Sequence, residues 1–378
     1  MKADRDLNFA LMDKKEDEIM LIFKNTSGYG RRTFVLLLLF LLTFTVSCDG
    51  STISDKDDAD KPETQDVENT RSEEFIYISN RDGTCSIAGL RGETDGNITI
   101  PPLSPDGDMV VEILHEAFRD NREIRAVVLS DTVAKIGSYA FFGCENLKEI
   151  SFSKSLETID EYAFELTGLE SVTIPTSMKI IGRGAFCKSE LSEVVIENGV
   201  RTICTAAFAT TKIQEITIPR SVELIEHGAF NNCTSLNNIN VDVENENYRS
   251  ASGNLIDKRS NMLIAVSGSA LLPESDGIIT MGEDAFCGRE IMNVEIPSGT
   301  EYIETHAFRL CVYLSEISIP NTVKVIETSA FYSCIDLRSI RYEGTVSEWE
   351  SIDKSEGWDM GVGEYTVYCT DGNIDKNS

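Results

Sequence analysis

Three histidines, His115, His227 and His306, are the only imidazoles in the chain and the first candidates for metal binding or general-base catalysis. Each stands one or two residues before an Ala-Phe pair. Because each belongs to a different copy of the repeat described below, no two imidazoles are expected to reach one ion or one nucleophile. The chain also lacks a glycine-rich phosphate loop and a metalloprotease helix motif. The sequence therefore predicts no metal and no cofactor, and an accidental carboxylate pair is the one catalytic device left open.

Ten cysteines invite a disulfide framework, but most of them stand at fixed distances from an Ala-Phe pair. A residue type confined to such columns is expected to be a small buried hydrophobe. Cys311 and Cys334 share a column in consecutive copies, at a spacing compatible with a disulfide, although stacked side chains run parallel rather than toward each other. The cysteines three residues after the phenylalanine are Cys144, Cys233, Cys311 and Cys334, and those one residue after it are Cys187 and Cys287.

The Ala-Phe pair itself recurs nine times, with intervals between the phenylalanines of 23, 23, 22, 22, 22, 56, 22 and 23 residues. Such a period predicts a solenoid, in which each unit buries its apolar face only against its neighbours. Each copy reads V-x-x-I-x-x-x-A-F-x-x-C-x-x-L-x-x-I-x-I-P, so an alternating strand ends at proline, and a second short extended piece leads to the Ala-Phe turn. The phenylalanines are Phe118, Phe141, Phe164, Phe186, Phe208, Phe230, Phe286, Phe308 and Phe331.

This consensus resembles the BspA-type leucine-rich repeat, over roughly Phe75 to Gly372. The resemblance implies a repeat solenoid: a β-rich, right-handed coil with short turns or 3-10 segments, capped at both ends. We expect an N-terminal β-hairpin cap at residues 75–100, the repeats at 101–342, and a C-terminal cap and tail at 343–378. The 56-residue interval predicts an insert at about 242–277, either a structural spacer or a partner contact.

The N-terminal region has the features of an export signal. The apolar run Phe34–Val46 follows Arg31 and Arg32 and has 13 residues, too few for a membrane-spanning helix of about 20. The Ser47-Cys48 step resembles a bacterial lipoprotein processing site, so residues 1–47 are interpreted as a signal region and Cys48 as lipidated, with ordinary cleavage nearby as the alternative. Acidic residues before Met20 have the wrong charge for a signal, which predicts that translation starts at Met20.

Residues 48–74 are predicted to form a disordered acidic tether, because Asp49–Glu74 holds ten acidic and three basic residues and almost no apolar ones. Together with Cys48, this tether predicts an exported protein that is lipid-anchored to the bacterial outer membrane and displayed on the cell surface. The formal net charge of −29 argues against a nucleic-acid partner, since such binding requires Lys and Arg to neutralise phosphates.

In each copy of the repeat, the outward positions of the alternating strand are mostly polar. Across the copies they form two columns without aromatic residues, and these columns are the candidate partner-binding face. Glu193 and Glu215 are expected to be direct neighbours, a pairing of like charges that costs stability. The alternative is a merely solvated surface, but an open sheet of such side chains suits a basic protein or a glycan. The candidate residues are Glu149, Ser151, Ser171, Thr173, Glu193, Glu215, Thr217, Glu295, Glu316 and Ser318.

These observations predict a non-catalytic, adhesin-like surface protein that binds an extracellular or host protein. The BspA-type resemblance implies attachment to host or neighbouring cells, although a fold alone does not establish a function. A glycan-capture surface lipoprotein is the alternative, and a hydrolase with an unrecognised carboxylate pair is a third hypothesis.

Overall fold

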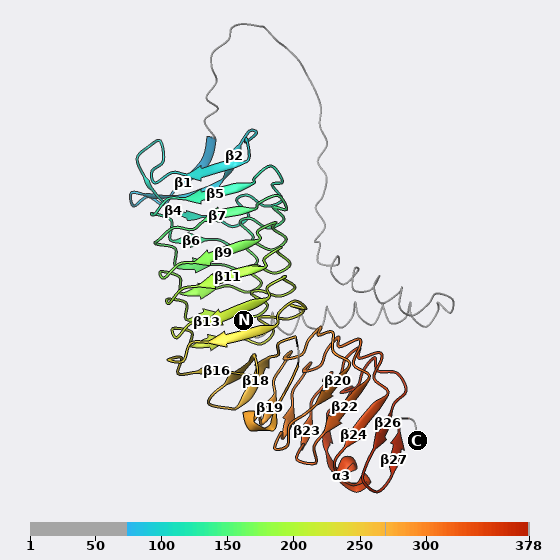
Figure 1. Cartoon of the computed structure of the whole chain (residues 1–378). Helices are drawn as coiled ribbons and strands as arrows, with labels where there is room; N and C mark the ends of the chain where they lie inside the picture. Colours follow the sequence, from blue (N-terminus) through green and yellow to red (C-terminus); the bar gives the residue numbers. More distant parts are fainter. Residues whose placement is uncertain (1–73, 269, 377–378) are drawn as a thin grey trace, which may run out of the picture. The chain divides into compact units, whose positions relative to one another are not determined.

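Each copy of the repeat folds into one turn of a β-solenoid, with a longer first strand, a short second strand and the Ala-Phe turn (Figure 1). The computed structural model describes residues 74–268 and 270–376, so the signal region 1–47, Cys48 and the tether up to residue 73 lie outside the described residues. Glu74 already begins a strand. Within the described ranges, no helix is long and apolar enough to cross a bilayer.

The first strands carry the Leu-x-x-Ile-x-Ile pattern and stack in parallel. Their alternating side chains are exposed and buried in turn, as in the Ser171–Ile174 strand, and proline follows directly at Pro175 because it cannot donate a ladder hydrogen bond. These strands are β3 (Asn97–Ile100), β5 (Ala126–Leu129), β7 (Glu149–Ser151), β9 (Ser171–Ile174), β11 (Glu193–Ile196), β13 (Glu215–Ile218), β15 (Asn238–Val241), β20 (Asn293–Glu295), β22 (Glu316–Ile319), β24 (Ser339–Tyr342) and β26 (Thr366–Tyr368).

The second strands are mostly two residues long and form their own parallel ladders, in which Ile180 pairs with Thr202 and Ile181 with Ile203. They are β4 (Met109–Ile113), β6 (Lys135–Ile136), β8 (Thr158–Ile159), β10 (Ile180–Ile181), β12 (Thr202–Ile203), β14 (Leu224–Ile225), β19 (Thr280–Met281), β21 (Tyr302–Ile303), β23 (Val325–Ile326) and β25 (Asp353–Lys354).

The Ala-Phe turns form a third ladder, because the backbone N–H of seven of the nine phenylalanines donates to the alanine carbonyl of the next turn, at 2.8 Å from Phe141 to Ala163. In all nine copies the residues two before and two after the phenylalanine have φ between 55° and 72°. This left-handed conformation costs a residue other than glycine about 1–2 kcal/mol. Gly143, Gly184, Gly228 and Gly288 avoid that cost, and at the other positions the ladder and the buried ring must offset it.

The buried phenylalanine rings stack in two files rather than one. Rings from Phe118 to Phe230 lie 5.0 to 5.9 Å apart between centroids, and those of Phe286, Phe308 and Phe331 lie 4.3 and 5.0 Å apart. The hydrophobic core divides in the same way into a first and a second core cluster, and the strand at Asn254–Asp257 contributes Leu255 to the first and Ile256 to the second. The apolar interior is therefore interrupted at the insert.

The insert consists of β16 (Tyr248–Ala251), β17 (Asn254–Asp257), β18 (Met262–Ala265) and the 3-10 segment η1 (Glu274–Asp276). Its three strands are antiparallel to one another, and β18 then pairs in parallel with β19. Tyr248 Oη accepts a hydrogen bond of 2.8 Å from the Ile225 N–H at the edge of β14. In the turn ladder, the Val266 N–H donates to the Ala285 carbonyl at 3.2 Å.

Both ends of the described solenoid are covered. At the N-terminal end, β1 (Glu74–Ser79) and β2 (Thr84–Arg91) form an antiparallel hairpin, and the Phe75 ring meets Phe118 edge-on at 6.5 Å. At the C-terminal end, Trp358 meets Phe331 edge-on at 5.7 Å, and β27 (Asn373–Asp375) closes the sheet against β26. The sequence did not predict the short helix α3 (Val346–Ser351), although its Thr345–Glu348 capping box is a sequence signature.

The nine described cysteines are free thiols. Four of them act as more than small hydrophobes, because Cys144, Cys233, Cys311 and Cys334 each donate from Sγ, at 3.0 to 3.1 Å, to the phenylalanine carbonyl of the preceding turn. In other turns Thr or Ser takes this position and donates to the phenylalanine carbonyl of its own turn. The column therefore selects a small hydrogen-bond donor, which explains why Cys alternates there with Thr and Ser.

Candidate functional site

The polar columns predicted from the sequence lie along the first strands, and eight of the ten candidate residues are exposed. The two exceptions, Glu316 and Ser318 on β22, are half-buried. The register matches the columns, since Ser171 pairs with Glu193, and Glu295 pairs with Ser318. Only the placement of these residues follows from the structure; their role in binding stays a prediction.

The insert divides this surface into two parts. One part runs over β3 to β15 and the other over β20 to β26, and the insert strands pack between them against β15. Gly253 in the insert accepts a hydrogen bond from the Ile239 N–H of β15 at 2.9 Å. Asn238 and Asn293 are therefore not consecutive members of one column, although they are consecutive in the repeat alignment.

Hydrogen bonds to Glu215 lessen the repulsion expected between the like charges of Glu193 and Glu215. Strands β11 and β13 lie next to each other without a hydrogen-bonded ladder. The Glu215 carboxylate accepts hydrogen bonds from the amides of Asn238, at 3.0 Å, and Asn240. These bonds hold Glu215 against β15 and lessen the cost of the pairing.

The second part of the surface ends on an aromatic side chain that the columns taken from the sequence did not include. Tyr368 on β26 pairs with Arg341 on β24, and its side chain is 45% exposed. Arg341 in turn forms a bidentate ion pair with Glu316, with N–O distances of 2.9 and 3.2 Å. The sequence missed Tyr368 because the repeat consensus fades before β26.

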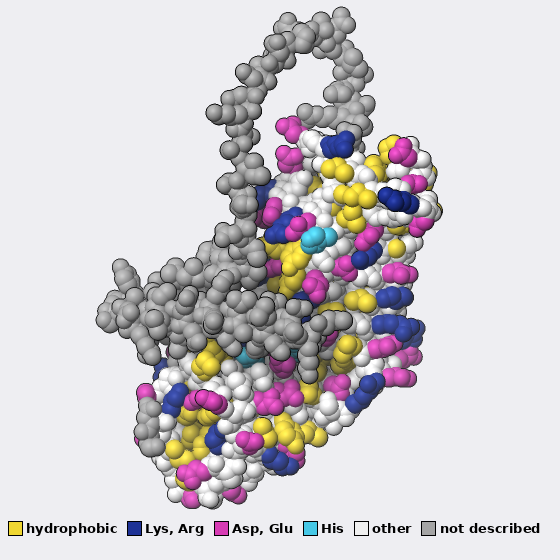
Figure 2. All heavy atoms as spheres, turned by 180° about the vertical axis from the view of Figure 1, so that it is seen from behind, with side chains coloured by type: hydrophobic (Ala, Val, Ile, Leu, Met, Phe, Trp, Pro, Cys, Tyr) yellow, Lys and Arg dark blue, Asp and Glu magenta, His cyan; other side chains and the backbone are white. Residues whose placement is uncertain are grey.

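Seen from behind, acidic and basic side chains lie interspersed along one edge of the stack, with apolar side chains between them (Figure 2). Ion pairs also join consecutive turns: Lys135 lies 3.2 Å from Glu112 and 3.0 Å from Asp160, and Arg201 lies 3.2 Å from Glu223. Surface pairs of this kind contribute roughly 0–1 kcal/mol each.

A second group of functional side chains gathers at the insert, around His227. Its Nδ1 lies 3.5 Å from Glu283 Oε1 and 3.5 Å from Asp284 Oδ2. His227 comes from the turn that carries Phe230, and both acids come from the turn that carries Phe286. These two turns are adjacent, because the Asn232 N–H donates to the Cys287 carbonyl at 3.1 Å. His227 and Glu283 therefore share one column of consecutive turns.

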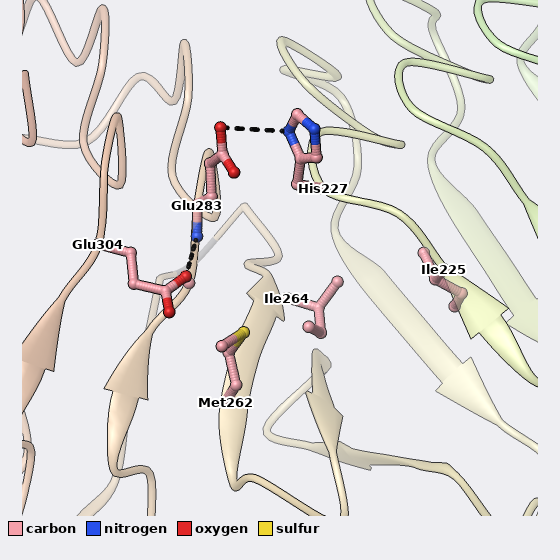
Figure 3. A pocket seen from close by; sticks show the side chains of 7 residues that line it. Ile225, His227, Met262, Ile264, Glu283 and Glu304 are labelled. Carbon is pink, nitrogen blue, oxygen red and sulfur yellow. Dashed lines mark hydrogen bonds and ion pairs between the residues drawn. The ribbon is translucent and has the colours of Figure 1, made fainter. Parts of the chain in front are cut away.

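A cavity of about 220 Å³ adjoins this group (Figure 3). Gly282 forms part of its wall, at a position where the turns of Phe230, Phe308 and Phe331 carry Glu226, Glu304 and Glu327. A Cβ on Gly282 would lie 2.5 Å from the Leu263 carbonyl oxygen of β18, much as one on Gly182, in the same column of a regular turn, would lie 2.6 Å from the Ile159 carbonyl oxygen. The lining side chains are Ile225, His227, Met262, Ile264, Glu283 and Glu304.

The neighbouring turn shows what these glutamates normally do. Glu304 accepts a hydrogen bond of 3.1 Å from the Glu283 N–H, and Glu226 and Glu327 accept equivalent bonds from Thr205 and Thr305. Because Gly282 has no carboxylate, the space beside His227 stays open. The cavity thus lies where glycine takes the place of this glutamate, beside the inserted strand β18.

The charges of the group are mutually dependent. A hydrogen bond with Asp284 raises the pKa of His227, and burial opposes this rise only in part. Burial alone would raise the pKa of Asp284, but hydrogen bonds from His227 and Asn231 hold it below its usual value. Burial raises the pKa of Glu283 and also that of Glu304. The arrangement therefore favours a positive charge between the carboxylates.

Chemically, this group offers one imidazole nitrogen and two carboxylate oxygens, all within 4.8 Å of one another. The partners of His227 among the described residues are the two carboxylates, and neither can act as the hydroxyl or thiol nucleophile of a triad. The sequence analysis missed the group because it compared histidines only with each other. The signal was present, since His227 and Glu283 both stand three residues before a repeat phenylalanine.

Comparison with known proteins bears on the whole chain. A family model described as "BspA type Leucine rich repeat region" matches in six copies over residues 111–240 and 272–352, more than half of the chain, and the unmatched stretch between them is the insert. A search of curated proteins found no match.

Among solved structures, the pneumococcal vaccine antigen PcpA is similar with a TM-score of 0.65 and 23% identity, over 81% of this chain and 82% of that one. A leucine rich cell surface protein from Faecalibacterium prausnitzii A2-165 has a TM-score of 0.47 and 24% identity, over 78% and 98% of the two chains. A leucine-rich repeat protein from Bacteroides ovatus ATCC 8483 has a TM-score of 0.46 and 20% identity, over 78% and 81%. At these identities, the likeness to PcpA shows the fold alone.

Proposed function

The chain belongs to the BspA-type leucine-rich repeat family, and on this premise we propose that it is a non-catalytic, adhesin-like binding protein of the bacterial surface. Its partner is an extracellular or host protein, and its contact surface is the polar face of the first strands. Members of this family are typically surface-associated, and a cell surface protein is among the similar solved structures.

The observation that carries the proposal is the regular exposure of small polar and acidic side chains along β7, β9, β11 and β13. Strands β9 and β11 are paired in register, so Ser171 and Glu193 stand side by side on a hydrogen-bonded ladder. Contacts of this kind are individually weak, but a rigid row of turns presents many of them without a large ordering cost. A basic partner would match the charge of Glu149, Glu193 and Glu215.

The test is a binding screen of the purified chain against a panel of extracellular proteins, followed by charge reversal on the face. Glu193→Lys with Glu215→Lys should abolish binding to a partner found in the screen. The matched control is Asp106→Lys with Glu157→Lys, the same change in charge at exposed positions outside the first strands. Binding that survives the face variant, or that is lost equally in the control, would contradict the proposed surface.

Cell-surface display and anchoring through Cys48 belong to the same proposal. Labelling of intact cells with an impermeant reagent should modify the chain, and Cys48→Ser should release it from the membrane fraction. A chain that becomes labelled only after the cells are opened would rule out an adhesin.

A glycan-capture function is the second candidate, and Tyr368 favours it. An aromatic ring beside the Arg341–Glu316 pair is a surface on which a sugar can stack. A glycan array with Tyr368→Ala as the variant separates the two candidates, since a protein partner on β7 to β13 would not respond to this change. Incubation with polymeric substrates tests the remaining hypothesis of a hydrolase.

A further inference from the structure

The His227 group lies where the solenoid is least continuous. The first core cluster includes Phe230 and the second includes Phe286, and no ring contact joins these two phenylalanines among the described residues. Strand β14 ends one sheet of second strands, and β18 belongs to another. His227 stands on the last turn of the first cluster, and Glu283 and Asp284 stand on the first repeat turn of the second.

Asp284 supplies an independent sign that a ligand belongs there. Its side chain is only 9% exposed, and its Oδ1 is buried without a hydrogen-bond partner among the described residues. The other oxygen of this carboxylate, Oδ2, is the one that faces His227. A buried carboxylate with an unsatisfied oxygen costs about 1–3 kcal/mol or more, and the charge of a cation bound at Oδ2 would offset this cost.

We propose that His227, Glu283 and Asp284 form a binding site for one divalent cation of the zinc class. Around an ion with ligand distances of about 2.0–2.1 Å, tetrahedral ligand atoms lie about 3.4 Å apart. The two distances from His227 Nδ1, both 3.5 Å, match this edge, and all three ligand atoms lie within 4.8 Å of one another. One imidazole and two carboxylates suit zinc and its first-row neighbours, whereas calcium and magnesium need about six or more oxygen ligands.

The fourth position of such an ion would be taken by water. The adjoining cavity of about 220 Å³ has room for it, and the Glu304 carboxylate in its wall is a polar partner. An ion at this place links the last turn of the first core cluster to the first repeat turn of the second. Its role is thus a structural clamp that couples the two parts of the solenoid.

The experiment uses the full chain, stripped with a chelator and then titrated with Zn²⁺ by equilibrium dialysis and metal analysis. The variants are His227→Ala, whose side chain is 46% exposed, and the isosteric Glu283→Gln. The matched control is His115→Ala, since His115 holds the same position in its turn and lies 3.6 Å from Glu116, but has no second carboxylate in its ion pairs. Circular dichroism confirms that each variant is folded before titration.

We expect the unmodified chain and His115→Ala to bind one Zn²⁺ per chain, and both site variants to bind it at least about tenfold more weakly. Thermal unfolding should shift upward with Zn²⁺ concentration in the first pair and not in the site variants. Absence of saturable Zn²⁺ uptake by the unmodified chain would overturn the proposal. Uptake that persists in His227→Ala would also overturn it, by placing the metal at the cysteines or at scattered acids. If Ca²⁺ displaced Zn²⁺ at equal concentration, the group would be only a nonspecific patch of negative charge, and the proposal would fail.

Discussion

The phenylalanine file makes a quantitative prediction, because the turn of Phe141 contains its own control. Phe141 is fully buried and stacks between Phe118, at 5.0 Å, and Phe164, at 5.2 Å. Truncation of a buried phenylalanine to alanine costs about 3–5 kcal/mol, and two ring contacts of roughly 0.5–1.5 kcal/mol each place Phe141→Ala in the upper half of that range. The adjacent Phe142 is half-buried, outside the file, and lies 4.9 Å from the Arg119 guanidinium. Phe142→Ala should cost about 1–2 kcal/mol.

Urea unfolding in the presence of a chelator measures these costs with two probes. Far-ultraviolet circular dichroism follows all turns, whereas tryptophan fluorescence follows Trp349 and Trp358, both of which belong to or pack against the second core cluster. Since a repeat protein transmits a local loss mainly to neighbouring turns, Phe141→Ala should lower the midpoint seen by circular dichroism more than the midpoint seen by fluorescence.

Two outcomes would refute this reasoning. If Phe142→Ala is as costly as Phe141→Ala, the stacked file does not hold the turns together. If both probes shift equally in Phe141→Ala, the two core clusters unfold as one cooperative unit, and the interruption at the insert has no energetic consequence. In the second case the proposed zinc clamp would also have nothing to couple, even if the ion binds.

Three further predictions follow from single contacts. Gly199→Ala would place a Cβ 1.9 Å from the Thr176 carbonyl oxygen, so we expect a loss of about 1–3 kcal/mol, measured by urea unfolding; an unchanged midpoint would show that these turns can move apart. Lys188→Met removes the cation 3.1 Å from Glu165, whose pKa burial already raises. The folded-state pKa of Glu165 lies above its unfolded value, so the protonated carboxyl favours the folded chain below about pH 4.3, and this contribution to stability is lost as the pH rises. The variant leaves the buried carboxylate without its cation, so it should be more destabilised at pH 7 than at pH 4. An equal loss of stability at both pH values would contradict the ion pair. Burial raises the pKa of Cys144 to about 12, so iodoacetamide at pH 8 should leave this thiol unmodified in the folded chain, and labelling found by mass spectrometry would refute its burial.

Much of the fold could be predicted from the sequence, because consecutive copies of a repeat stack on one another in sequence order. Once the Ala-Phe pairs are aligned, the neighbours of any residue are its column mates, and this alone places Ser171 beside Glu193. The left-handed residues around each phenylalanine could not be predicted in this way. Glycine occupies few of those positions, and residues such as Tyr139 adopt φ of 58° only because the turn ladder holds them there.

The candidate sites show where column reasoning succeeds and where it stops. It would place His227 beside Glu283 if the turns on either side of the insert were treated as neighbours, although 55 residues separate their phenylalanines. It does not reveal the cavity, because Met262 and Ile264 in its wall belong to the insert strand β18, which no column contains. Nor does it show that Asp284 is buried with one oxygen unbonded.

The insert also shapes the surroundings of the His227 group, because its strand β18 lines the cavity there. In a solenoid of identical turns, each polar group meets the same neighbours in every turn. A site that occurs only once therefore needs a turn with a different neighbour. Here the inserted strands supply that difference: the core divides at β17, and Met262 and Ile264 of β18 line the cavity beside His227 and Glu283. If the insert were only a spacer, deletion of its strands would restore a continuous phenylalanine file and raise stability. If it builds the cation site, the same deletion would remove Zn²⁺ binding together with any coupling that Zn²⁺ provides.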